Sequence, residues 1–334
     1  MLKYITQRVL MIVPVLIGVS ILTFSLLHLI PGDPAKSMLG IKATETQLEL
    51  LREELGLNDP FIVQYGKFMG DILQGDLGKS IQSNEAITHE LMQKLPATIE
   101  LTIFAMILAV IVGVVAGVIA AVKQYSWFDN ISMTGALFGV SMPIFWLGLM
   151  MILLFSVQLQ LLPPSGRLST SVELETITNF YLLDSILTWN WVAFKDAFFH
   201  LLMPGIALGT IPMAIIARMT RSSMLEVMNQ DYIRTADAKG LKKHLIIFQH
   251  ALKNAFLPVL TIIGMQFGFL LGGAVLTESI FSWPGVGRYV YLAVLGRDFP
   301  VVQSTILVIA VIFVLVNLIT DLLYKYFDPR IRYE

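Results

Sequence analysis

The sequence predicts an all-α membrane protein with six transmembrane helices and a small helical extracytoplasmic insertion after the first of them. Of its 334 residues, 56% are hydrophobic and only 14% are charged, whereas soluble domains are about a quarter charged. Six apolar stretches are also long enough to cross the roughly 30 Å of membrane hydrocarbon as helices. Composition and segment length therefore indicate the same class.

The six spans are expected at residues 10–30, 97–122, 131–157, 199–217, 256–281 and 301–324. Pro204 and Pro212 interrupt the fourth span, but prolines are tolerated in membrane helices where neighbouring groups satisfy the freed carbonyls. The first span follows Lys3 and Arg8, as a signal peptide would. Because its apolar run is too long for a typical signal peptide, we expect it to be retained as an anchor.

Lysine and arginine residues set the expected orientation, because cytoplasmic loops carry an excess of them. Placing the amino terminus inside puts the basic residues of the 218–253 stretch and of both ends of the chain in the cytoplasm. The two shorter outside loops then hold only Arg167, Lys195, Arg288 and Arg297. We therefore expect both termini in the cytoplasm.

The chain is predicted to divide by membrane topology. The expected parts are 1–30 (tail and first helix), 31–96 (an extracytoplasmic helical region), 97–324 (a five-helix core with a cytoplasmic loop at 218–255) and 325–334 (a cytoplasmic tail). In the outside region, Thr44 and Gln47 fit a capping box, and Gly56 ends the helix that follows. That helix is expected to carry an apolar stripe of Leu48, Leu51 and Leu55.

Small residues recur within the spans at a spacing of four, which lets helix backbones approach closely in lipid. The pairs are Gly113 with Gly117, Gly135 with Gly139, Gly205 with Gly209, and Gly268 with Gly272. Ordinary glycine use in membrane helices would explain any single pair equally well. Together the pairs favour a compact bundle.

The sequence lacks the motifs of several classes of enzyme and metal-binding protein. A phosphate-binding G-x-x-x-x-G-K-[ST] motif and the zinc motif H-E-x-x-H do not occur, and the chain has no cysteine. The five histidines are scattered along the chain, and a net charge of −1 gives no electrostatic case for binding nucleic acid. We therefore predict no catalytic residue, no metal site, no bound cofactor and no nucleic-acid partner.

Ionisable residues in the apolar segments are candidates for function. Glu100, Arg218, Glu278 and Asp321 lie near the ends of the predicted spans, where snorkelling or an interfacial position is the alternative. Glu278 lies deepest in an apolar run and is the best candidate for a functional acid. With Met142, Trp146 and Gln266, chosen by polarity or position in the spans, it forms the predicted lining of a translocation path.

The cytoplasmic loop at 218–255 contains a short predicted helix. Asp231 is expected to cap it and to place its charge at the positive end of the helix. Ile233, Ala236 and Tyr232 give the helix a weakly apolar face, Lys239 lies at its negative end, and Gly240 stops it in a left-handed conformation. A second polar helix is expected at 242–254, before Pro258 starts the next span. The alternative is a merely solvated, positively charged loop.

At these residues the chain resembles the inner-membrane permease subunits of binding-protein-dependent ABC importers. The cytoplasmic loop of that family reads Glu-Ala-Ala, three residues, and then Gly; here Arg234, Thr235, Ala236 and Gly240 occupy those positions. Loops of the family's peptide branch read R-T-A-x-A-K-G-L and then H-A-L-x-N, as residues 234–241 and 250–254 do. Asp237 stands where that branch often has arginine.

Further motifs extend the resemblance over essentially the whole chain, in order. They lie at 30–34 (IPGDP), 75–78 (GDLG), 141–146 (SMPIFW), 218–224 (RMTRSSM), 277–285 (TESIFSWPG) and 328–332 (DPRIR). Within the family, the chain is most similar to the dipeptide and oligopeptide permeases.

The resemblance implies the type I permease fold of ABC importers and a place in the bacterial inner membrane. It implies a half-channel that pairs with a homologous second permease, with two ATPase subunits that hold ATP and Mg²⁺, and with a periplasmic or lipoprotein peptide-binding protein. Membrane lipid would surround it. The loop residues that would contact the ATPases are Asp231, Tyr232, Arg234, Thr235, Ala236, Asp237, Lys239 and Gly240.

Other interpretations stay open at this point. The same scaffold serves importers of nickel chelates, glutathione or haem-like cargo, and the choice of cargo depends largely on the binding protein. An ion-coupled secondary transporter would usually show paired repeats and charged sites near mid-membrane, and the sequence shows neither. A purely structural membrane scaffold would tolerate substitutions in the 218–255 loop.

Overall fold

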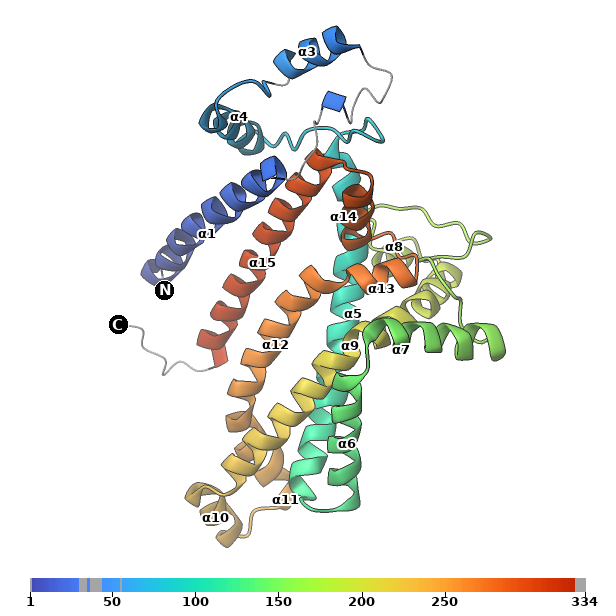
Figure 1. Cartoon of the computed structure of the whole chain (residues 1–334). Helices are drawn as coiled ribbons and strands as arrows, with labels where there is room; N and C mark the ends of the chain where they lie inside the picture. The colour runs from blue at the N-terminus through green and yellow to red at the C-terminus, as the bar shows by residue number, and fades with distance from the viewer. Residues whose placement is uncertain (1, 30–34, 37–43, 55, 328–334) are drawn as a thin grey trace. The chain divides into compact units, whose positions relative to one another are not determined.

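The structure is a computed structural model that describes residues 2–29, 35–36, 44–54 and 56–327 (Figure 1). Over these residues the chain is almost entirely helical, and the only β-type pairing is an isolated bridge between Lys79 and Ala86. The predicted all-α class is therefore confirmed. The motifs at 30–34 and 328–332 lie outside the described residues, as do Leu55 and the side chains of Leu51 and Asp321.

The chain forms two compact units. Unit 1 comprises Met1–Pro96 and Gly285–Val314, and unit 2 comprises Ala97–Pro284 and Leu315–Glu334. Two long helices, α5 (Ile87–Val122) and α15 (Phe299–Phe327), continue from one unit into the other. The predicted division at residues 30, 96 and 324 concerns membrane topology rather than contacts, and it stays a prediction.

Unit 1 contains α1 (Leu2–Leu29), α3 (Glu45–Glu54), α4 (Phe61–Leu73), α14 (Val286–Leu295) and the first parts of α5 and α15. The predicted capping box begins α3: the Thr44 backbone N–H donates to the Gln47 side chain at 3.0 Å, and the Gln47 N–H donates back to the Thr44 hydroxyl at 3.4 Å. Phe24 of α1 packs against three rings of α4, from Phe61, Tyr65 and Phe68.

Unit 2 is a helical bundle. Besides the second parts of α5 and α15, its elements are α6 (Trp127–Ser141), α7 (Ile144–Met151), the π-helix η1 (Ile152–Gln158), α8 (Tyr181–Leu187), α9 (Trp191–Met228), α10 (Asp231–Ala238), α11 (Lys243–Leu245), the π-helix η2 (Ile246–Leu252), α12 (Lys253–Gly273) and α13 (Val275–Ile280). Its main core joins α5, α9 and α12, for example through Leu101, Leu208 and Val259, none more than 1% exposed. At the lower end of the bundle in Figure 1, the chain leaves α9 and forms α10 and α11.

Close approach of α5 to α9 depends on two of the predicted glycine pairs. A Cβ added at Gly117 would lie 2.5 Å from the Thr220 Cβ and 2.6 Å from the Ala217 carbonyl oxygen, and one at Gly209 would lie 2.8 Å from the Ala105 carbonyl oxygen. Any side chain there would force the helices apart. Gly135 and Gly272, by contrast, face open space within 4 Å, so the spacing alone does not identify a contact.

Among the described residues, four helices are long and apolar enough to cross a membrane, and a fifth span results if a bent pair is counted as one. The four are Ile87–Val122, Trp191–Met228, Lys243–Gly272 and Phe299–Thr320. The described side chains of α1 add a shorter apolar stretch, Leu10–Ser25. The predicted total of six spans is compatible with this arrangement and stays a prediction.

Two expected helices differ from those observed. The predicted span 131–157 is not one helix: α6 and α7–η1 meet at 103° because Met142 is extended before Pro143, which cannot continue the helical hydrogen bonding. The predicted polar helix at 242–254 is not separate either. It continues through η2 into α12, and Pro258 lies inside that helix rather than at its start.

Candidate functional site

The α10 helix begins directly after α9 ends. Gln230 is extended (φ −74°, ψ 148°) and occupies the N-cap position without a side-chain hydrogen bond, so Asp231 is the first helical residue. The prediction that Asp231 caps the helix is therefore wrong by one position. Its carboxylate still lies in the first turn, where the helix dipole favours negative charge.

The end of α10 follows the predicted pattern closely. Gly240 has a φ of +74°, the left-handed conformation that glycine adopts without strain. Its N–H donates to the Asp237 carbonyl at 2.9 Å, and the Leu241 N–H donates to the Ala236 carbonyl at 3.3 Å. These two bonds form a Schellman motif, with Lys239 as the C-cap. The predicted glycine stop is confirmed.

One face of α10 is packed against the bundle. Ile233 and Ala236 are buried in an apolar cluster with Met224 of α9 and Ala251 of η2. Tyr232 is half-exposed, and its hydroxyl accepts a hydrogen bond from the Asn254 side chain at 3.0 Å. The predicted apolar face is thus confirmed for Ile233 and Ala236 but not for Tyr232, and it packs α10 against α9, which precedes it, and η2, which follows it.

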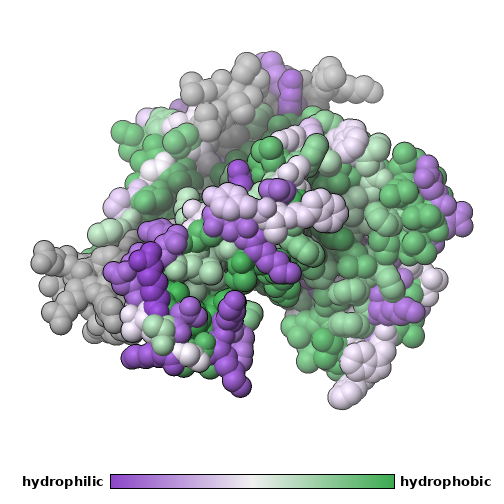
Figure 2. All heavy atoms as spheres, turned by 90° about the horizontal axis from the view of Figure 1, so that it is seen from below, coloured by the Kyte–Doolittle hydropathy of each residue, from purple (hydrophilic) through white to green (hydrophobic). Residues whose placement is uncertain are grey.

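The opposite face of α10 is exposed and polar. Its exposed residues are Asp231, Arg234, Thr235, Asp237 and Lys239. The Arg234 guanidinium lies 3.6 Å from the Asp231 carboxylate, a solvent-exposed pair that contributes little to stability. Hydrophilic side chains gather at this end when it is seen from below (Figure 2). The helix is therefore packed against the bundle on one face and exposes a surface of mixed charge on the other.

Beyond α10 and α11 the chain forms a π-helix, a conformation that was not predicted from the sequence. The η2 segment spans Ile246–Leu252 and includes the His250-Ala251-Leu252 motif; Ala251 is fully buried beneath α10. π-helical turns are rare and frequently mark functional positions. The H-A-L-x-N motif marks this segment in the sequence, but the residue types in the motif do not predict a π-helix.

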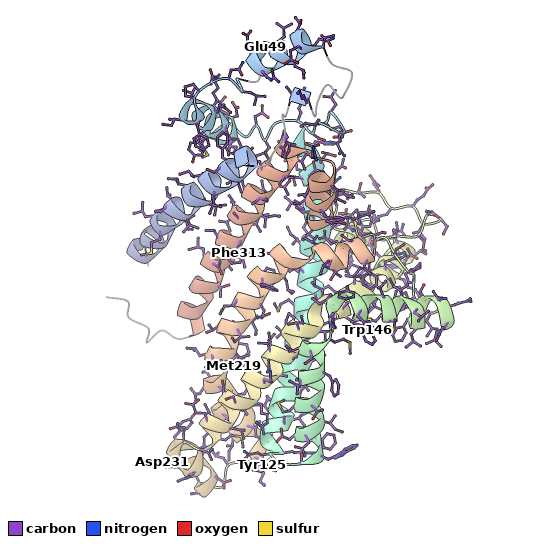
Figure 3. All side chains as sticks on the ribbon, in the orientation of Figure 1. Glu49, Tyr125, Trp146, Met219, Asp231 and Phe313 are labelled. Carbon is purple, nitrogen blue, oxygen red and sulfur yellow. The ribbon has the colours of Figure 1, made fainter. Side chains whose placement is uncertain are left out.

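Two of the four predicted path residues lie together. Met142 and Trp146 line a shallow hollow of about 350 Å³ at the break between α6 and α7, with Phe138, Ser141, Pro143 and Phe145. Figure 3 shows Trp146 on α7, away from the end that carries Asp231. Gln266 and Glu278 do not contribute to this hollow. The side chains that line the hollow are apolar or aromatic except for the Ser141 hydroxyl, so a bound molecule would make van der Waals contacts there and no ion pair.

Glu278 is fully buried in α13. Its carboxylate accepts a hydrogen bond from the Thr98 hydroxyl of α5 at 2.6 Å. The nearby Trp283 indole N–H donates to the Ala97 carbonyl at 2.8 Å, so two polar contacts attach this segment to α5. The assignment of Glu278 to the translocation path stays a prediction; the geometry gives it a role in holding α13.

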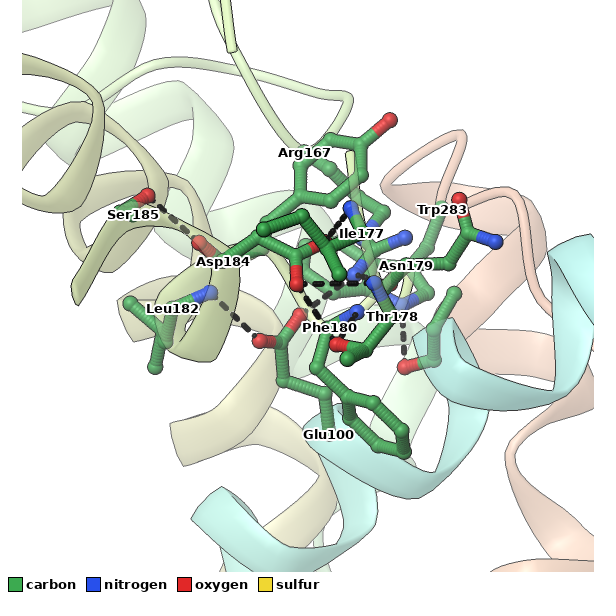
Figure 4. Close-up of polar contacts among 12 residues, drawn as sticks. Glu100, Arg167, Ile177, Thr178, Asn179, Phe180, Leu182, Asp184, Ser185 and Trp283 are labelled. Carbon is green, nitrogen blue, oxygen red and sulfur yellow. Dashed lines mark hydrogen bonds and ion pairs between the residues drawn. The ribbon is translucent and has the colours of Figure 1, made fainter. Parts of the chain in front are cut away.

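A buried polar cluster surrounds Glu100 (Figure 4) and was not predicted from the sequence. The Arg167 guanidinium donates to one Glu100 oxygen at 2.6 Å, and the Leu182 N–H donates to the other at 2.8 Å. Arg167 also lies over the Tyr181 ring, 3.7 Å from its centroid. The sequence identified Glu100 as a span-end acid and Arg167 as an outside cation, with no indication of their pairing.

Asp184 organises the loop beside this cluster. It accepts hydrogen bonds from the Thr178 N–H and hydroxyl, at 2.9 and 2.6 Å, and from the Ile177 N–H at 3.2 Å (Figure 4). Together with the Arg167 contact to the Asn179 carbonyl, these bonds fix the segment before α8. Within the described part of the chain, no group of three or more His, Asp or Glu side chains is placed to hold a metal ion.

The chain matches a known protein family. Residues 113–333 match the family described as "Binding-protein-dependent transport system inner membrane component", and residues 1–102 match the family of its N-terminal region. The chain is 56% identical to the dipeptide transport system permease protein of Alkalihalophilus pseudofirmus. It is 49% identical to the di/tripeptide transport system permease protein of Pseudomonas aeruginosa. Both alignments cover 100% of each chain.

A solved structure shares the fold. The inward-facing structure of the MetNI methionine ABC transporter superposes with a TM-score of 0.54 at 16% identity, covering 71% of this chain and 96% of that one. At this identity the likeness concerns the fold alone.

Proposed function

Because the chain belongs to the family of binding-protein-dependent transport system inner membrane components, we propose that it forms half of the translocation path for dipeptides and short peptides in an ATP-driven importer. The observation that carries the cargo assignment is the full-length identity of 56% and 49% to permeases named for dipeptide and di/tripeptide transport. The chain is a multi-pass inner-membrane transport subunit rather than an enzyme.

Two features support the proposed partners: the sequence has no phosphate-binding motif of its own, and α10 exposes a polar face. We assign the energy source to two separate ATPase subunits that hold ATP and Mg²⁺. The exposed residues of α10, including Arg234, Thr235 and Asp237, are suited to a groove on such a subunit because Ile233 and Ala236 already seat the helix firmly. A homologous second permease would complete the channel, and a periplasmic or lipoprotein binding protein would deliver the peptide.

The proposed orientation places α10 in the cytoplasm with both termini. The basic residues around α10 support it, because Lys239, Lys242 and Lys243 follow one another within five residues at this end of unit 2. ATPases must bind on that side. The Arg167 loop and the stretch before α8 would then face outside.

Transport in this arrangement is a conformational exchange. ATP would close the ATPase dimer, which would move α10 and shift the permease between inward-open and outward-open states. No residue of this chain needs to transfer a proton or form a covalent bond. Its contribution is to seat α10, to carry its movement into the bundle, and to line the path, to which we assign the hollow at Met142 and Trp146.

Uptake measurements test the proposal. In a strain that lacks this gene, the restored gene should support uptake of a labelled dipeptide and should not support uptake of nickel chelates, glutathione or haem. Uptake should require ATP hydrolysis by the partner subunits. If the purified chain alone drove uptake into liposomes from a proton or sodium gradient, a secondary transporter would be the correct interpretation.

A further inference from the structure

We propose that α6 and α9 move as one rigid body during transport, and that the ion pair between Asp129 and Arg221 holds them together near the α10 end. The inference rests on the proposed function, because it concerns how movement of α10 reaches the hollow at the end of α6. It makes Asp129 and Arg221 positioning residues that do not touch cargo or ATPase.

The ion pair has the geometry of a two-pronged fork. The Arg221 Nε donates to one Asp129 oxygen at 2.6 Å and its Nη2 donates to the other at 2.8 Å. The Asp129 side chain is 3% exposed and the Arg221 side chain 25%. Two parallel bonds fix the distance between the groups and their relative orientation, which a single contact would not do.

Asp129 is itself held by the turn that precedes α6. Its second oxygen also accepts from the Tyr125 N–H at 2.9 Å, and its own N–H donates to the Ser126 hydroxyl at 3.3 Å, which caps the helix. Tyr125 has a φ of +61°, so the turn between α5 and α6 is tight. Arg221 therefore binds α9 to the first turn of α6 and to the α5–α6 connection.

A second contact lies further along the same two helices. A Cβ added at Gly139 would be 3.2 Å from the Thr210 Cγ2 and 3.7 Å from the Ala214 Cβ, so α6 and α9 are in close contact there. Asp129 and Gly139 are about 15 Å apart along α6 at 1.5 Å per residue. Two attachments at that separation oppose both sliding and rotation of one helix against the other.

The joined helices connect the two places that the proposed function uses. One turn after Arg221, Met224 is fully buried in the cluster that holds Ile233 and Ala236 of α10. At the other end, α6 stops at Ser141, which lines the hollow with Met142. Figure 3 shows Tyr125 and Asp231 at the same end of unit 2. A displacement of α10 would therefore reach the hollow through α9 and α6 together.

The natural absence of cysteine gives a direct test. Gly139→Cys with Ala214→Cys introduces the only two thiols of this chain, and a Cβ separation of 3.7 Å suits a disulfide. We expect the oxidised pair, in the complete reconstituted transporter, to import dipeptide as fast as the reduced pair. Failure of the pair to cross-link, or a block of transport on oxidation that a reductant reverses, would overturn the rigid-body proposal.

The ion pair is tested in the same background. Asp129→Asn should lower the peptide imported per ATP hydrolysed by about tenfold, a size in the range for residues that couple distant sites, while ATPase subunits still co-purify. Oxidising the Gly139→Cys/Ala214→Cys pair in that variant should restore coupling. Arg221→Lys, which keeps the charge and loses the fork, should fall between. Unchanged coupling in Asp129→Asn, or no rescue on oxidation, would refute the role of the pair.

Uptake by the unmodified transporter separates the two proposals. If it did not import dipeptide with ATP, the proposed function would fail whatever the cysteine pair did. If the unmodified transporter imported dipeptide and oxidation of the Gly139→Cys/Ala214→Cys pair stopped import, the proposed function would stand. The proposal that α6 and α9 move as one rigid body would then be wrong.

Discussion

The Arg167 guanidinium lies 2.6 Å from a Glu100 carboxylate oxygen at a position where the two side chains are only 4% and 8% exposed. One partner belongs to α5 and the other to the loop that precedes α8, 67 residues along the chain. Removing two charges from water is costly, and here the compensation comes from the ion pair, from the Leu182 N–H, and from the Tyr181 ring beneath the guanidinium. The pair therefore attaches the loop to the bundle.

Arg167→Ala should destabilise the protein by about 3–5 kcal/mol, because it leaves the Glu100 carboxylate buried without its cation. Thermal unfolding of the purified protein in detergent measures the effect. Lys195→Ala is the matched control, since Lys195 is an exposed cation of the same region and should change stability little. Equal effects of the two substitutions would contradict the importance of the buried pair.

Gly240→Val should cost about 1 kcal/mol or more locally, because a β-branched residue is strained at a φ of +74°. We expect transport to be lost through failed docking of the ATPases or through uncoupling, with the membrane helices still inserted. Co-purification of the ATPase subunits and dipeptide uptake are the two measurements. Gly240→Asn is the control: asparagine tolerates the left-handed conformation and should retain most activity. Normal docking and uptake in Gly240→Val would count against the role of α10.

Gly117→Ala should destabilise unit 2 by roughly 1–3 kcal/mol, because the added methyl overpacks the interface between α5 and α9. Its Cβ would meet the Ala217 carbonyl oxygen at 2.6 Å, a backbone atom that moves only if the helix moves. Gly135→Ala is the control, since nothing lies within 4 Å of a Cβ there. Denaturation in detergent should separate the two variants; similar midpoints would show that α5 and α9 are not in close contact.

The features of α10 could be predicted because local rules decide them. Gly240 stops the helix, and Ile233 with Ala236 forms one face by helical spacing alone. Such rules do not determine the exact first residue of the helix. Gln230 occupies the N-cap position, so Asp231 is the first residue of α10 and not its cap. Local chemistry thus determines an element's existence more firmly than its boundary.

The break at Pro143 shows why the rest could not be predicted. Pro204 and Pro212 lie inside the continuous helix α9, where both are buried, whereas Pro143 ends α6 and starts a helix in a new direction. The residue type is the same, so the presence of a proline does not by itself predict whether a helix continues or breaks. The fork between Asp129 and Arg221 joins residues 92 apart in sequence, and no periodic pattern indicates such a pairing.

The pH dependence of stability should report on Tyr289 of α14, whose hydroxyl donates a hydrogen bond to the Glu90 carboxylate. Burial raises the pKa of Tyr289 well above its ordinary value near 10, and the hydrogen bond to Glu90 raises it further. The folded protein therefore keeps this proton at pH values where the unfolded chain releases it. The associated stability is complete below a pH of about 10 and declines as the pH rises above it.

Tyr289→Phe removes the titrating hydroxyl and should flatten this decline. We expect the unfolding midpoint of the unmodified protein to fall more steeply between about pH 9 and 11 than that of the variant, although the variant starts lower because Glu90 loses its donor. Tyr125→Phe is the control, since Tyr125 is 83% exposed, and it should leave the slope unchanged. Parallel pH profiles for the unmodified protein and Tyr289→Phe would show that the Tyr289 proton does not contribute to folding.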